Sequence, residues 1–237
     1  EITTRLVGSE MCIRDSYNYH KGMKEIIQEL KVLLKTKSIG TDSDRALLLD
    51  FQAALETQPE KAIKLEKNAL AQIENITADN ARLVSNLHAN LGGLYRMNGY
   101  PDLAREHMEK SISLLDQFNL LHINDSIPQI ANYAMFLTEQ QEPERGISEL
   151  QKLSGIIKEY HSDDCLDYAK VQETLGTIYL MTANLPQAKT HFKKAFKIYE
   201  KIWADEPEMI EAKYREIQEL YPQIGFSIGK TLSGLLT

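Results

Sequence analysis

Several residue types are scarce in this chain of 237 residues, and each scarcity excludes a class of structure. The 12 glycines and 7 prolines are scattered, and the apolar–polar alternation of a strand never persists, which excludes a β-rich fold. Of the two cysteines, Cys12 lies in a segment that is predicted below to be non-native, so Cys165 alone cannot form a disulfide framework or a cysteine metal site. No apolar run approaches the roughly 20 residues that span a bilayer, and the first residues lack the pattern of a secretory signal. We therefore expect a cytoplasmic protein that does not enter a membrane.

The net charge and the spacing of candidate motifs exclude further classes of function. The formal net charge of −7 disfavours a nucleic-acid binder, since such proteins usually carry a basic stripe. The segment "GFSIGKT" (225–231) has three residues between its glycines where a phosphate-binding loop has four. The histidines form no HExxH pair, and His107 and His191 are predicted to be packing or surface residues. We expect no enzyme activity, no cofactor and no metal site.

The sequence has a helical period over most of its length. Segments such as "AIKLEKNALAQI" and "AKTHFKKAFKIYEKI" return apolar residues at every third or fourth position, the spacing that lines one face of a helix. The fold class predicted from this pattern is all-α.

An internal repeat of 42 residues organises these helices. "NLGGLYRMNGYPDLAREHMEKSI" and "TLGTIYLMTANLPQAKTHFKKAF" align at an offset of 84, which is twice 42. Stepping by 42 gives columns of one residue type, including Ala62, Ala104, Gly146 and Ala188, and the prolines Pro59, Pro101 and Pro143. We infer that small residues lie where two helices approach closely and that each proline begins a helix.

The motif L-G-x-x-Y, followed by Ala nine residues after the Tyr and a large apolar residue four later, resembles the tetratricopeptide repeat. The 42-residue version is similar to the repeat of kinesin light chains and of many bacterial tetratricopeptide proteins, and the resemblance covers about residues 43–221. It implies an α-solenoid of antiparallel helix pairs with a right-handed superhelical twist. The first repeat departs from the pattern, with Asp50 at the small position and Glu66 at the large apolar one.

The predicted helix ranges follow from these columns. The pairs are 43–57 with 59–76, 81–98 with 101–118, 126–139 with 143–160, and 166–183 with 186–204. A fifth first helix is predicted at 207–221, a lone second helix and linker within 17–42, and a cap or truncated repeat at 222–237.

The stretch "LVGSEMCIRDS" (6–16) differs from the rest of the chain. Its reverse translation is similar, codon for codon, to the end of an adapter used in transposase-based sequencing libraries. Residues 1–16 are therefore predicted to be a non-native segment, so that the native beginning and any effector domain before residue 17 are missing.

The resemblance also predicts a binding surface, because the first helix of each tetratricopeptide pair lines the concave side of the array. Counted from the Gly92 column, its residues are Asn86, Asn90, Gly93, Met97, Asn132, Met135, Lys170, Thr177 and Met181. Asn90 and Asn132 are 42 residues apart and can pair with the backbone of an extended peptide. The carboxylate clamp of some tetratricopeptide domains needs two cations that are missing at Asn86 and Thr174.

Three functions are compatible with such a surface. The favoured hypothesis is a protein-interaction scaffold that binds a peptide segment or helix of a partner. The second is a peptide-sensing domain of a bacterial regulator whose effector domain is missing upstream, and the third is an accessory domain of an enzyme.

Overall fold

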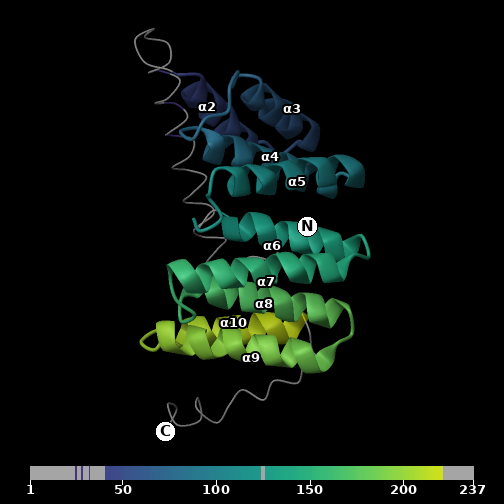
Figure 1. Cartoon of the computed structure of the whole chain (residues 1–237), viewed down its shortest axis with the longest axis vertical. Coiled ribbons are helices and arrows are strands. Elements are labelled where there is room, and N and C mark those ends of the chain that lie inside the picture. The colour runs from purple at the N-terminus through teal and green to yellow at the C-terminus, as the bar shows by residue number, and fades with distance from the viewer. Residues whose placement is uncertain (1–24, 26–27, 29–31, 33–40, 124–125, 221–237) are drawn as a thin grey trace. The chain divides into compact units, whose positions relative to one another are not determined.

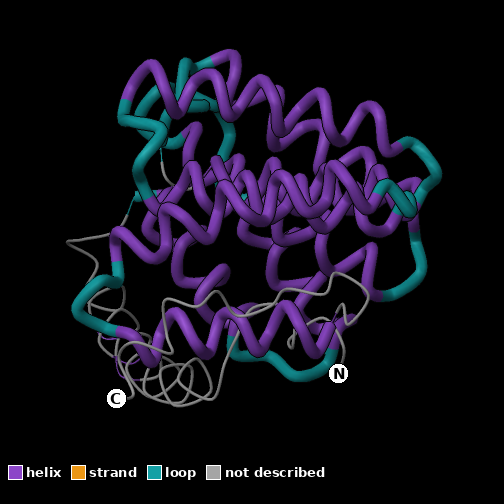
Figure 2. Tube along the Cα trace, turned by 90° about the horizontal axis from the view of Figure 1, so that it is seen from below, coloured by secondary structure: helices purple, strands orange, loops and turns teal. Residues whose placement is uncertain are grey.

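The computed structural model describes residues 25, 28, 32, 41–123 and 126–220. Within these residues every regular element is a helix, and Figure 2 shows helices joined by loops. The predicted all-α class is therefore confirmed. The adapter-like segment 1–16 and the segment 222–237 lie outside the described residues, as does most of 17–42.

The chain divides into two units, one ending at Leu137 and the other beginning at Thr138. The first unit contains helices joined by short loops (Figure 1): α2 (Asp42–Ala54), α3 (Pro59–Leu70), α4 (Ala81–Met97), α5 (Pro101–Gln117) and most of α6 (Ser126–Glu139). The second contains α7 (Pro143–Tyr160), α8 (Leu166–Met181), α9 (Leu185–Ile202) and α10 (Pro207–Leu220). These bounds lie within three residues of the predicted ones at every helix end but one.

The exception is the end of α3, which lies at Leu70 and not at residue 76. The side chain of Asn80 accepts a hydrogen bond from the Thr77 N–H at 2.8 Å and donates one to the Asn75 carbonyl at 2.9 Å. Such local side-chain bonds offer the backbone an alternative to helix, and they hold this stretch as a loop before α4.

Small residues allow the two helices of a pair to approach closely, as their columns predict. A Cβ added at Gly92 of α4 would lie 2.5 Å from Cγ of Met108 and 3.3 Å from the carbonyl oxygen of Ala104, both on α5. A Cβ at Gly176 of α8 would lie 3.0 Å from the ring of Phe192 on α9. Only glycine fits these two contacts without displacing the neighbouring helix or side chain.

The residues that begin the second helix of each pair, and the turns before them, also recur along the chain. Pro59, Pro101 and Pro143 begin α3, α5 and α7, where a missing N–H costs no helical hydrogen bond. The turn before the second helix of a pair contains a residue with positive φ in three repeats, at Gly99 (76°), Gln141 (66°) and Ala183 (59°). These three residues form a further column with a step of 42, of which only one member is glycine.

Candidate functional site

In the first unit, the predicted binding residues lie on one side of each of two helices. We call them the first-helix face: Asn86, Asn90, Gly93 and Met97 on α4, and Asn132 and Met135 on α6. Steps of four and three residues keep the α4 members in line along the helix. All six are partly or fully exposed, and Met97 is 58% exposed. The opposite sides of the same helices are buried, through residues such as Leu91 and Phe136.

A polar network fixes the N-terminal end of this face. The Nε2 of Gln129 on α6 donates to Oδ1 of Asn86 at 2.5 Å. The Oε1 of Gln129 accepts from the hydroxyls of Ser85 at 2.8 Å and Ser111 at 2.6 Å. Because Gln129 is only 9% exposed, these bonds connect α4, α5 and α6 in a nearly dry environment. Asn86 therefore has a fixed orientation, with its amide oxygen bonded to Gln129.

Asn90 forms hydrogen bonds to two acids of the first repeat. Its Nδ2 donates to Oδ1 of Asp50 on α2 at 2.9 Å and to Oε1 of Glu66 on α3 at 3.1 Å. Both amide hydrogens are thus used within the chain. Asn132, 42 residues later, is exposed and has no hydrogen-bond partner in the described part of the chain.

Burial raises the pKa of both acids beside Asn90. Glu66 is 2% exposed, and burial, with the charge of Asp50 second, raises its pKa to about 9. Burial also raises the pKa of Asp50. The Oε2 of Glu66 has no hydrogen-bond partner in the described residues, which adds to the cost of ionising it. The sequence identified both acids as departures from the repeat pattern, but it did not show that Asn90 joins them.

The three predicted residues of the second unit all lie on α8, but their exposure differs. Lys170 is exposed and lies 3.8 Å from Asp167, and Met181 is 46% exposed. Thr177 is only 9% exposed, and its hydroxyl donates to the carbonyl of Glu173 in its own helix. Thr177 therefore offers much less surface to a ligand than its column predicts.

A histidine pair is a feature that the sequence reasoning missed. His88 on α4 and His107 on α5 place their Nδ1 atoms 2.8 Å apart, and the ring of Tyr95 stacks on His107. Burial lowers the pKa of His88 to about 4 and also lowers that of His107. The same arrangement recurs 84 residues later with Gln172, His191 and Tyr179. The 84-residue offset could have revealed this arrangement, because His107 of α5 and His191 of α9 occupy the same column of the repeat.

The remaining candidate features are few in the described residues. A pocket of about 450 Å³ in the second unit lies between α7 and the end of α8 and is lined by Pro143, Glu144, Ile147, Ser148, Gln151, Tyr179, Thr182 and Asn184. In the described ranges no three His, Cys, Asp or Glu side chains are placed to hold a metal ion. Nor is any helix there long and apolar enough to cross a membrane.

Comparison with known families matches residues 126–201 to the tetratricopeptide repeat model. Residues 126–201 therefore belong to tetratricopeptide repeats. The match includes α6 to α9, which are the third and fourth of the predicted repeats. No curated protein sequence matches the chain.

Solved structures show the same fold over most of the chain. BtubC from P. vanneervenii has a TM-score of 0.63 at 19% identity, covering 77% of this chain and 72% of that one. The nearly identical TPR-like repeats of a kinesin light chain-like protein of Podosopora anserina also score 0.63, at 14% identity, covering 81% and 94%. MamA scores 0.52 at 16% identity, covering 79% and 94%. The predicted likeness to kinesin light chain repeats is confirmed at the level of fold.

Tetratricopeptide repeats stack so that each contacts only its neighbours, and they present extended surfaces to other proteins. In this chain the first and second repeats share the Asp50–Glu66–Asn90 contact, which lies where the repeat pattern calls for small and apolar residues. At this contact, two acids that are hydrogen-bonded to Asn90 replace apolar packing between neighbouring repeats.

Proposed function

We propose that the chain is a protein-interaction scaffold that binds an extended peptide segment of a partner on the first-helix face. The observation that supports this most is the contrast between Asn132 and its surroundings. α6 buries Tyr133, Phe136 and Leu137, yet it presents an exposed carboxamide without a partner in the described residues, beside the partly exposed Met135.

The chemistry of the face suits a peptide backbone. A carboxamide both donates and accepts, so Asn132 can pair with a backbone N–H and C=O, while Asn90 contributes an acceptor and Asn86 donors. Met97 and Met135 supply polarisable surface that adapts to different side chains. The face therefore favours a backbone-directed ligand whose side chains contact the methionines.

This proposal can be tested without knowing the natural partner. Twelve-residue random peptides displayed on phage are selected on the protein, and the tightest is labelled and titrated by fluorescence polarisation. We expect Asn132→Ala to raise its Kd about tenfold, because unpaired backbone groups cost about 1–3 kcal/mol and 1.4 kcal/mol is a factor of ten.

Asn68→Ala on α3 is the matched control, since Asn68 is an exposed carboxamide outside the face. It should change the Kd by less than twofold. Equal affinity for Asn132→Ala and the parent protein would contradict the proposal. The same complex separates a scaffold from a peptide sensor, because a sensor would also change amide hydrogen exchange in helices that neither form the first-helix face nor contact it.

A further inference from the structure

The exposed side of α9 carries a row of lysines unlike the rest of this acidic chain. Lys189, Lys193, Lys197 and Lys201 follow one another at steps of four, and Lys194 lies beside them; we call these five the lysine face. All five are exposed. The buried side of the same helix holds Ala188, Phe192, Ala195, Phe196, Ile198 and Tyr199. The helix thus presents hydrophobic residues to its own unit and cations to solvent.

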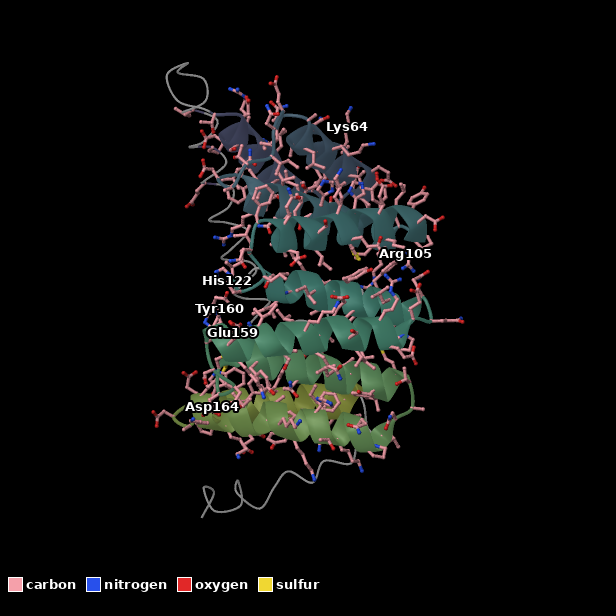
Figure 3. All side chains as sticks on the ribbon, viewed as in Figure 1. Lys64, Arg105, His122, Glu159, Tyr160 and Asp164 are labelled. Atoms are coloured by element: carbon pink, nitrogen blue, oxygen red, sulfur yellow. The ribbon has the colours of Figure 1, made fainter. Side chains whose placement is uncertain are left out.

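Few acids neutralise this face. Asp164, which precedes α8 and is labelled in Figure 3, forms an ion pair with Lys201. Glu200, the one acid within α9, accepts a hydrogen bond from the Tyr214 hydroxyl at 2.9 Å. Lys189, Lys193, Lys194 and Lys197 form no ion pair with a carboxylate among the described residues. Five lysines and one glutamate give α9 a net charge of +4, against −7 for the whole chain.

The repeat architecture does not require these lysines. The equivalent residues of α5 are Arg105, Glu109, Lys110, Ser113 and Gln117, and those of α7 are Ile147, Gln151, Lys152, Gly155 and Glu159. Both sets mix charges or lack them, which is typical of a solvated helix surface. Like charges four residues apart destabilise a helix, so the row of lysines in α9 weakens its own helix.

We propose that the lysine face binds an acidic segment of a partner protein, with carboxylates spaced along one side of it. From Lys189 to Lys201 the row extends over 12 residues, or about 18 Å of helix axis. That length matches about three turns of a partner helix with a Glu or Asp at every fourth position. The lysine face shares no residue with the first-helix face.

Charge favours a short acidic segment over a nucleic acid or a lipid surface. Those polyanions extend well beyond one helix and would face the net negative charge of the remaining chain. At physiological salt, electrostatic effects decay over about 8 Å, so an acidic segment confined to α9 gains the attraction of the lysines and avoids most of that repulsion.

The test uses the whole chain and a labelled 14-residue probe peptide with glutamate at every fourth position. Binding is measured by fluorescence polarisation at 50 mM and 150 mM salt. We expect the triple variant Lys189→Gln, Lys193→Gln, Lys197→Gln to raise the Kd about tenfold at low salt, and the parent affinity to fall as salt rises. The same peptide with glutamine in place of glutamate should not bind.

The matched control is the triple variant Lys61→Gln, Lys64→Gln, Lys67→Gln, which removes three exposed lysines of α3 and should leave the Kd unchanged. If both triple variants weakened peptide binding equally, the proposal would be overturned, because the net charge of the chain alone would then explain the binding. Tighter binding of the parent to a 12-nucleotide oligo-dT or to phosphatidylserine vesicles than to the peptide would overturn it too. Helicity by circular dichroism confirms that each variant is folded.

Discussion

The Nδ1 atoms of His88 and His107 lie 2.8 Å apart, so one hydrogen bond joins the imidazoles of α4 and α5. A single hydrogen occupies that bond, and the ring that accepts it must be neutral. At the equivalent site, Oε1 of Gln172 lies 2.9 Å from Nδ1 of His191. An amide oxygen only accepts, so that bond persists when His191 is protonated. The two repeats should therefore respond differently to acid.

We expect His88→Gln to reduce the acid sensitivity of the first unit. The pKa of His88 is lowered by burial, to about 4, from an unperturbed 6.5, and that of His107 is lowered by burial as well. Lys110 and Lys67 lower the pKa of His107 further, while Glu106 raises it. The stability that the neutral pair contributes is therefore fully present above about pH 6.5 and is lost as the pH falls from about 6.5 to about 4.

In urea unfolding followed by circular dichroism, the parent should lose about 1 kcal/mol more than His88→Gln between pH 7 and pH 5. The two proteins should be about equally stable at pH 8. Gln172→His is the reciprocal control, since it creates a histidine pair with His191 and should make the second unit more acid-sensitive. If His88→Gln lost stability with falling pH as steeply as the parent, the histidine pair would not be the source of the acid sensitivity.

The acid pair of the first repeat predicts the opposite pH dependence. Burial, with the Asp50 charge second, raises the pKa of Glu66 from 4.5 to about 9. Stability from its protonated form is present below about pH 4.5 and lost as pH rises through 9. Glu66→Gln keeps an acceptor for Asn90 and adds a donor toward Asp50 without a charge. At pH 8 we expect it to raise the free energy of unfolding by about 1–2 kcal/mol.

Glu60→Gln on the same helix is the control for this change, because Glu60 is exposed. This substitution should leave the pH dependence of the free energy of unfolding unchanged between pH 5 and pH 8. Hydrogen exchange of α2 and α3 checks that the effect is local. Slower exchange in Glu66→Gln at pH 8 but not at pH 5 is the expected result, and faster exchange at pH 8 would show that Glu66 is charged in the folded protein.

The sequence predicted the helices well because the 42-residue columns record packing between neighbouring helices. Gly92 with Ala104 and Gly176 with Phe192 form contacts that depend on residues close in sequence and identical in role from repeat to repeat. Such columns determine where each helix lies. The end of α3 was missed because the apolar period continues past Leu70, whereas the chain there forms turns and then a loop that includes the side-chain bonds of Asn80.

The polar contacts of the site could not be predicted in the same way. Asn90 binds Asp50, 40 residues away, and Glu66, 24 residues away, and each pairing depends on side-chain orientation. The sequence marked Asp50 and Glu66 as exceptions to their columns without showing what they contact. The predicted roles of Asn90 and Asn132 in peptide binding stay predictions, and the selection experiment above tests them.

The repeat turns offer a prediction about backbone strain. Gln141 and Ala183 have positive φ at the position that Gly99 occupies in the second repeat, and this region costs a non-glycine residue about 1–2 kcal/mol. We expect Ala183→Gly and Gln141→Gly each to stabilise the protein by about 1 kcal/mol in urea unfolding. Gly99→Ala should destabilise it by a similar amount. No gain in either glycine variant would contradict the idea that these turns are strained.

The close approach of α8 and α9 gives the sharpest test of the packing. A Cβ at Gly176 would lie 3.0 Å from three atoms of the Phe192 ring, which is fully buried and has little room to move. Gly176→Ala should therefore destabilise the second unit by about 1–3 kcal/mol. Gly155 on α7 has no atom within 4 Å of an added Cβ, so Gly155→Ala should stabilise by up to about 1 kcal/mol through helix propensity alone. Thermal unfolding of both variants measures the difference in sign. If both substitutions shifted the Tm in the same direction, glycine at 176 would not be required by contact with Phe192.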